Sequence, residues 1–298
     1  MKKKSPFITK DMGTAKAKHN TQAEERTAIF GAFESVLASI VAGLRRLADN
    51  RQQLDDPSTI PPPTLLWQFK TNCEALIDAF ADHVFAEYLL EYRKLLKIRI
   101  DYPGIFDVVK FNDIIQQATQ HLKPNGAMPG IVAIDVTSWL RYSHEKQFFE
   151  FLSNIFKNHG KIMFIFYANT DNTIDISNLE TTISRFKKVK ALCIELPDTA
   201  KLLELMENTR LKNYTLQDCA KELLISSIDE IRNSNKNFQG LDEILLMAQD
   251  ISADLLNSNI INGDVTAAML AEYAPNSTYV EKKKKNIGNN SIGFNTSK

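Results

Sequence analysis

The chain has 298 residues, of which 44% are hydrophobic, and its 36 basic residues balance 36 acidic ones. This length and composition fit a globular protein of one to two domains. No apolar run reaches the roughly 18 residues of a transmembrane helix, so no membrane-spanning segment is expected. The basic N-terminal stretch is not followed by an apolar core segment, so it is not a secretory signal, and we expect a cytoplasmic protein.

The charge is unevenly distributed along the chain. Residues 1–20 contain six Lys and one Asp, a net charge of +5, and residues 281–298 contain five Lys and one Glu, a net charge of +4. The remainder therefore carries −9. We interpret both ends as disordered basic tails on an acidic body, although contact with nucleic acid or an acidic partner is an alternative. Neither tail interleaves basic and aromatic residues, so nucleic-acid binding is not expected.

No metal or nucleophile motif stands out. Cys73, Cys193 and Cys219 are far apart, show no metal-ligand spacing and are expected to be reduced thiols in the core. No two histidines are spaced as a ligand pair on a helix, and no G-x-S-x-G nucleophile elbow occurs. We therefore expect no metal, no cofactor and no membrane partner.

Hydrophobic periodicity predicts a helix over residues 21–50 and then an alternation of strands and helices over residues 60–197. Strands are expected at Thr64–Phe69, Leu95–Tyr102, Ile131–Val136, Lys161–Asn169 and Lys190–Leu196, and helices at Asn72–Tyr92, Phe106–Leu122 and Glu145–Gly160. This alternation is typical of a parallel sheet with helices on both faces.

The pattern becomes wholly helical after Pro197. Asp198 and Thr199 form an N-cap signal, and the apolar stripes that follow predict a small helical bundle. The expected organisation is therefore a tail over residues 1–20, an α/β domain over 21–197, a helical lid domain over 198–280, and a basic tail over 281–298.

Four short motifs follow one another in a recognisable order: "GIVAIDVT" at 130–137, "SRF" at 184–186, "FQGLD" at 238–242 and "SIGF" at 291–294. This order resembles the AAA+ ATPases, with their P-loop NTPase fold. The nearest group is that of the stage V sporulation ATPases and red-type Rubisco activases, whose motifs read "GVLFIDEA", "SRF", "FGNAR" and "KIGF". The resemblance covers roughly residues 21–294.

The resemblance implies an ATP site, and the sequence departs from it at three places. A phosphate-binding loop needs glycines so that backbone N–H groups approach the phosphates, yet no glycine occurs between Gly43 and Gly104. Lys70 and Thr71 are either remnants of the family's "GKT" (a degenerate Walker A) or a polar helix start. Val136 stands where the family has its catalytic glutamate. The degenerate nucleotide site would comprise Lys70, Thr71, Asp135, Val136, Asn169 and Asp242.

Asp242 occupies the position of the family's sensor-2 arginine, and an aspartate there would repel phosphate. Arg185 of "SRF" matches the family's arginine finger, which acts on the neighbouring subunit's site; it is equally interpretable as a surface arginine among basic neighbours. We therefore expect a catalytically inactive pseudo-ATPase with a structural or regulatory role, in an oligomer with itself or with a competent AAA+ paralogue. The alternatives are a divergent active ATPase and a monomeric adaptor that binds a client protein.

Overall fold

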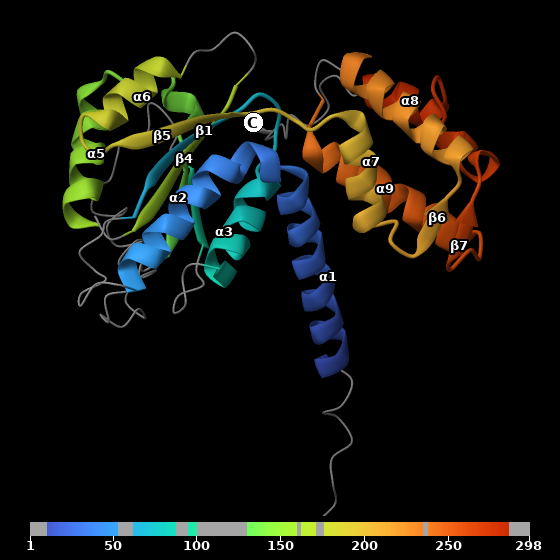
Figure 1. Cartoon of the computed structure of the whole chain (residues 1–298). Coiled ribbons are helices and arrows are strands. Elements are labelled where there is room, and N and C mark those ends of the chain that lie inside the picture. Colours follow the sequence, from blue (N-terminus) through green and yellow to red (C-terminus); the bar gives the residue numbers. More distant parts are fainter. Residues whose placement is uncertain are drawn as a thin grey trace, which may run out of the picture. The chain divides into compact units, whose positions relative to one another are not determined.

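The computed structural model divides the chain into two compact units (Figure 1). The α/β unit is Ile29–Leu196, and the helical unit combines Met1–Ala28 with Pro197–Lys298. The structure describes residues 11–52, 62–87, 95–99, 130–159, 162–170, 176–234 and 238–285. The helix expected at Phe106–Leu122 and the "SIGF" motif at 291–294 lie outside the described residues.

The α/β unit is built on a five-stranded parallel sheet. Its strands are β1 (Thr64–Phe69), β2 (Leu95–Arg99), β3 (Ile131–Asp135), β4 (Met163–Asn169) and β5 (Val189–Ile194). They lie in the order β2-β3-β4-β1-β5, with β1 between β4 and β5. Strands β1, β3 and β4 are almost fully buried, which is why they are continuous apolar runs in the sequence. The predicted parallel sheet is confirmed.

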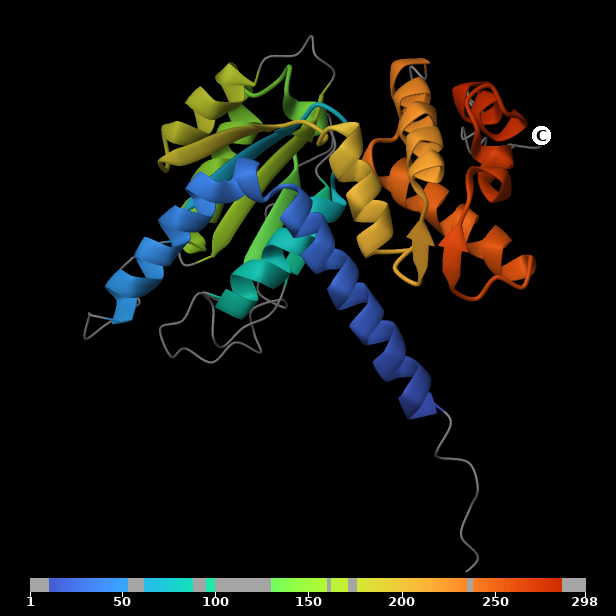
Figure 2. The ribbon, with the colours of Figure 1, turned by 45° about the vertical axis from the view of Figure 1, so that its right-hand side comes forward.

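Helices cover both faces of this sheet (Figure 2). On one face lies α3 (Ala75–Glu87), where Phe80 packs edge-on against Trp67 of β1 with ring centroids 5.0 Å apart. The other face carries the short helix η2 (Thr137–Trp139), α5 (Lys146–Asn158) and α6 (Ser177–Ser184) around a large apolar cluster. Helix α6 was not predicted, because its polar sequence "SNLETTIS" offers only two apolar residues to the core. The sheet is thus sandwiched by helices, as the sequence predicts.

The helix predicted over residues 21–50 is in fact two helices, α1 (Asp11–Ala32) and α2 (Glu34–Gln52). At the break the Phe33 N–H donates to the Phe30 carbonyl, three residues back, instead of four. The Phe33 side chain is fully buried, and Phe30 stacks on His83 of α3. Residues 11–20, which we expected to be part of a disordered tail, are the start of α1. Among the described residues no single helix could span a membrane, and only the bent α1–α2 pair passes that test jointly.

The helical unit contains α7 (Thr199–Asn208), α8 (Asp218–Ser234) and α9 (Leu241–Asn257), followed by η3 (Ala267–Tyr273) and α10 (Thr278–Lys285). The predicted N-cap is confirmed, since the Asp198 carboxylate accepts a hydrogen bond from the Lys201 N–H over 2.8 Å. The unit also contains a two-stranded parallel sheet that was not predicted, formed by β6 (Tyr214–Leu216) and β7 (Gly263–Val265). Each of these strands has only three residues, which is too short for an alternation of apolar and polar residues to be recognised in the sequence. The expected small helical domain after the α/β domain is therefore confirmed.

The expectation of three core cysteines is wrong for two of them. Cys73 is fully buried, whereas Cys193 and Cys219 are exposed; all three are free thiols. Cys193 lies on β5, an edge strand of the sheet, and Cys219 lies in the first turn of α8 on its solvent side. Their apolar sequence neighbours suggested burial, but only every second strand residue and one helix stripe face a core.

Candidate functional site

The candidate site lies at the carboxyl edge of the sheet, where ligands bind in open α/β folds. Because all five strands are parallel, their last residues come together at this edge. Phe69 pairs with Asn169, and Asp135 pairs with both Arg99 and Tyr167 in the ladder. Two of the predicted site residues, Asp135 and Asn169, are therefore the final residues of neighbouring strands.

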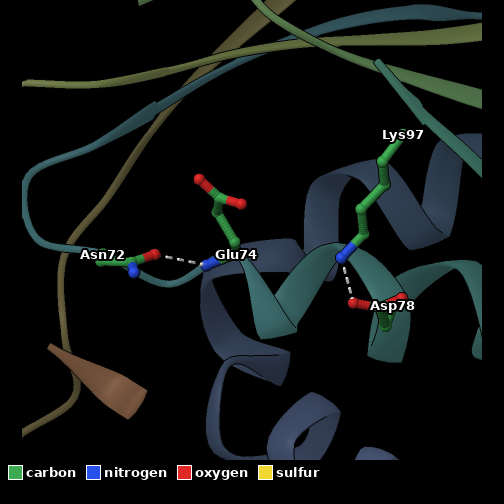
Figure 3. A network of polar contacts seen from close by, with 4 residues as sticks. All are labelled: Asn72, Glu74, Asp78 and Lys97. Atoms are coloured by element: carbon green, nitrogen blue, oxygen red, sulfur yellow. Dashed lines mark hydrogen bonds and ion pairs between the residues drawn. The ribbon is translucent and has the colours of Figure 1, made fainter. Parts of the chain in front are cut away.

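The connection from β1 to α3 is only five residues long, Lys70 to Glu74, and contains no glycine. The Lys70 N–H still bonds to the carbonyl of Ile194 at the end of β5, over 3.0 Å. The Asn72 side-chain oxygen then accepts from the Glu74 N–H over 3.1 Å, closing a tight turn just before α3 (Figure 3). Lys70 and Thr71 consequently belong to the strand exit, and neither begins the helix.

Asp135 is 93% removed from solvent, with 7% of its surface exposed. Its Oδ1 atom accepts two hydrogen bonds from Thr137, one from the backbone N–H over 2.9 Å and one from the hydroxyl over 2.6 Å. This is the geometry of an Asx turn, in which an aspartate satisfies the backbone two residues on. The carboxylate thus caps the turn into η2. No group of three or more His, Cys, Asp or Glu side chains that could hold a metal is found in the described part of the chain.

Val136 points into the core. Its side chain is fully buried in the apolar cluster beneath α5, and its N–H donates to the Tyr167 carbonyl over 2.9 Å. A valine in this environment can neither accept a proton nor orient a water molecule. The position that follows Asp135 therefore contributes packing only.

Asn169 connects three of the segments at this edge. Its backbone N–H donates to the Thr137 hydroxyl over 3.0 Å, and its Nδ2 donates to Glu74 Oε1 over 2.8 Å. The chain of contacts therefore runs from Asp135 through Thr137 and Asn169 to Glu74. Asn169 Oδ1 is buried and accepts no hydrogen bond from the described residues. The end of β3, the end of β4 and the start of α3 are thereby joined by side chains.

Tyr167 adds a hydroxyl to this network. The pKa of Tyr167 is raised, first by burial, then by the negative charges of Glu74 and Asp135 and by a hydrogen bond to Glu74; the positive charge of Arg99 opposes the rise. The phenol therefore remains a neutral donor at physiological pH. One turn along α3, Asp78 pairs with Lys97 of β2 (Figure 3).

Glu74, Thr137 and Tyr167 were not predicted as site residues from the sequence. A weak signal existed for Thr137, because Asp-x-Thr after a strand favours an Asx turn. Glu74 and Tyr167 carry no local signal, since their roles depend on which strands lie side by side. Two of the predicted residues, Asp135 and Asn169, form one polar network with these three and with Asn72. We call it the strand-end network: Asn72, Glu74, Asp135, Thr137, Tyr167 and Asn169.

Asp242 lies in the helical unit, while the other five predicted site residues lie in the α/β unit. It is an exposed residue in the first turn of α9, and Gly240 precedes that helix with a φ of 65°. A carboxylate there interacts favourably with the partial positive charge of a helix N-terminus. This accounts for Asp242 without any ligand.

Arg185 follows the last residue of α6 and is exposed. Its guanidinium carbon lies 5.3 Å from the centre of the Phe149 ring on α5, a cation–π distance. Phe149 in turn contacts Phe186, which is itself 36% exposed. Burial lowers the pKa of the neighbouring Lys187. Among the described residues no carboxylate pairs with Arg185, so its charge is free to meet an anion.

The sequence matches no known family profile and no curated protein. Among solved structures, the chain is similar to Hsp104 in a closed-state cryo-EM reconstruction with ATPγS and FITC-casein. The identity is 11%, the TM-score is 0.45, and the match covers 84% of this chain but 43% of the Hsp104 chain. The chain itself combines a β2-β3-β4-β1-β5 parallel sheet, covered by helices on both faces, with a small helical unit formed by Met1–Ala28 and Pro197–Lys298.

Proposed function

We propose that this protein is a catalytically inactive AAA+-like subunit, a pseudo-ATPase with a structural or regulatory role. The observation that carries the proposal is the β1–α3 connection. A phosphate cradle of the form G-x-x-x-x-G-K-[ST] takes about eight residues and needs its glycines for close backbone approach. The connection here has five residues and no glycine, so it lacks both the length and the conformational freedom of such a cradle.

The strand-end network supports the proposal independently. Glu74 places a carboxylate immediately before α3, where a phosphate would meet the first N–H groups of the helix. Asn169 and Tyr167 both donate to that carboxylate. An anion entering this edge would meet like charge from Glu74 and Asp135 instead of open donors. Val136, buried in the core, offers no general base.

The test is a melting experiment on the isolated protein in low-millimolar Mg-ATP. A ligand at 100 times its Kd stabilises the folded state by about 2.7 kcal/mol, which a thermal shift readily shows. We expect no shift with Mg-ATP beyond that produced by the same concentration of Mg²⁺ with sulfate. A clear upward shift specific to ATP would contradict the proposal and favour a divergent active ATPase.

We further propose that the subunit assembles with a competent AAA+ paralogue, or with itself, and supplies Arg185 to a neighbouring site. The finer likeness to the sporulation ATPase and Rubisco activase group is part of this proposal and rests on the "SRF" and "SIGF" motifs. The support from geometry is that Arg185 is exposed, has no carboxylate partner among the described residues, and is supported by the Phe149 ring.

The corresponding experiment is a steady-state ATPase assay on a co-purified complex. An arginine supplied in trans raises phosphoryl-transfer rates by roughly 10³–10⁵-fold, so we expect this protein to stimulate the ATPase activity of its partner. Arg185→Ala should abolish that stimulation while the complex stays assembled. Arg185→Lys should restore little, because an ammonium lacks the planar fork of the guanidinium. Lys188→Ala, on the same exposed turn, is the matched control and should change nothing. A protein that elutes as a monomer with every AAA+ candidate supports the adaptor alternative instead.

A further inference from the structure

Two adjoining pockets on the helical unit form one groove. The first, of about 560 Å³, lies between the C-terminal part of α9, the turn after it, and η3. The second, of about 600 Å³, lies between η3 and the start of α10. Both are lined by Ala271 and Glu272, so the two are continuous along η3. We call this feature the η3 groove.

The η3 groove has an apolar floor that is held in place. Leu255, Ile260 and Met269 line it, and Met269 leaves 46% of its surface exposed. Two tyrosines also line the groove: the Tyr273 hydroxyl donates to Asp254 over 2.5 Å, and the Tyr279 hydroxyl donates to Asp250 over 2.8 Å. Each tyrosine is thus fixed to α9 by a charge-assisted hydrogen bond. An exposed methionine over a fixed floor is typical of a surface that binds an apolar side chain.

The charged residues around the η3 groove favour an occupant with a positive net charge. Residues 197–280 contain six basic and thirteen acidic residues, a net charge of −7. Three charged residues line the groove: Asp254, Glu272 and Lys282. Glu272 is exposed and makes no ion pair or hydrogen bond within the described residues. A basic segment that carries apolar side chains is the complementary partner.

One such segment belongs to this chain. Residues 1–10, "MKKKSPFITK", carry four lysines and no acid, with Phe7 and Ile8 between Lys4 and Lys10. They lie outside the described residues and lead directly into α1. Helix α1 is fixed to the helical unit by ion pairs from Glu25 to Arg210, over 2.6 Å, and from Glu24 to Lys212.

The ten residues before α1 can span up to about 33–36 Å when extended. The helical unit has about 130 residues, which corresponds to a radius of gyration of about 14 Å. We propose that the η3 groove binds residues 1–10 of the same chain, with Phe7 and Ile8 against Leu255 and Met269 and the lysines beside Asp254 and Glu272. The basic N-terminus is then an internal ligand of the helical unit.

The experiment compares the full-length wild type with the full-length double variant Phe7→Ser/Ile8→Ser, called the serine version, in which we expect the η3 groove to be empty. Hydrogen exchange in η3 should be faster in the serine version than in the wild type. A fluorescein-labelled peptide of residues 1–10 should bind the serine version, detected by anisotropy, and the wild type at least several-fold less. Added salt should weaken this binding.

Substitutions in the η3 groove locate the contact. In the serine version, Met269→Asp should weaken peptide binding by roughly tenfold or more through lost apolar burial, and Glu272→Lys by roughly three- to tenfold. Asp264→Lys is the control, because Asp264 is an exposed acid on β7 outside the groove. All three positions are exposed, so the variants should melt near the parent temperature.

Equal exchange in the wild type and the serine version, or peptide binding that is indifferent to Met269→Asp and Glu272→Lys, overturns the proposal. Protection of η3 that appears only as protein concentration rises shows that the segment comes from a second copy, which overturns the intrachain form.

Discussion

Asn169 Nδ2 donates a hydrogen bond to Glu74 Oε1 over 2.8 Å, and this contact joins the end of β4 to the turn before α3. The two loops leave neighbouring strands of the sheet and would otherwise be free to separate. Hydrogen bonds to a charged acceptor are worth about 1.5–3 kcal/mol to stability. The edge of the sheet that binds ligands in other α/β folds is here tied together by the chain itself.

Replacing Asn169 by alanine should lower the free energy of unfolding by about 1.5–3 kcal/mol, because the Glu74 carboxylate loses one of its two donors. Urea denaturation measures the change. Asn158→Ala is the matched control, since Asn158 is exposed and its amide bonds, among the described residues, to Asn154 over 3.2 Å; it should cost less than about 0.5 kcal/mol. If both variants lower the free energy of unfolding equally, the Asn169–Glu74 hydrogen bond contributes no more to stability than an exposed contact does.

Stability should fall at alkaline pH through Tyr167. Burial and the charges of Glu74 and Asp135 raise the pKa of Tyr167 above its usual value, which is about 10 in the unfolded chain. The folded state holds its proton longer, so the stabilisation is complete below pH 10 and is lost as pH rises beyond it. Tyr167→Phe should therefore flatten the decline in unfolding free energy between about pH 9.5 and 11.

The control for this effect is Phe166→Leu, a buried substitution on the same strand without a titrating group. It should lower stability by a similar amount at every pH in that range. Should Tyr167→Phe leave the alkaline slope of the wild type unchanged, Tyr167 does not control it.

Introducing a glutamate directly after Asp135 should destabilise the protein. Val136→Ala removes buried methyl groups and should cost about 1–3 kcal/mol. Val136→Glu places a carboxylate in the apolar cluster without a partner, so its cost should exceed that of Val136→Ala by several kcal/mol. Thermal unfolding of both variants checks the order. A Val136→Glu protein as stable as the wild type would show that this side chain can reach the sheet edge.

Arg185 and Phe149 should be weakly coupled in stability. An exposed cation–π contact is worth about 0.5–1 kcal/mol, so a double-mutant cycle of Arg185→Ala with Phe149→Leu should give a coupling energy of that size. Either Arg185 variant should leave the fold intact. A coupling energy indistinguishable from zero would mean that the ring does not hold the guanidinium in solution.

The strands were predictable because a buried parallel strand must be apolar along its whole length, as in "IVAID" and "MFIFYA". The break at Phe33 was not predictable, because the apolar spacing continues unchanged across it. The strand-end network escaped sequence reasoning for a related reason. Glu74 and Asn169 are 95 residues apart, and only the strand order places them within hydrogen-bonding distance. Sequence periodicity reports which face a residue occupies, but not which other segment lies beside it.

The helical unit has a discontinuous sequence, since Met1–Ala28 and Pro197–Lys298 belong to it while Ile29–Leu196 forms the other unit. During translation the acidic partners Glu24 and Glu25 leave the ribosome long before Arg210 and Lys212 exist to pair with them. The α/β unit can thus fold while the helical unit is still incomplete. The ion pairs that hold α1 in the helical unit can therefore form only after Arg210 and Lys212 have been synthesised.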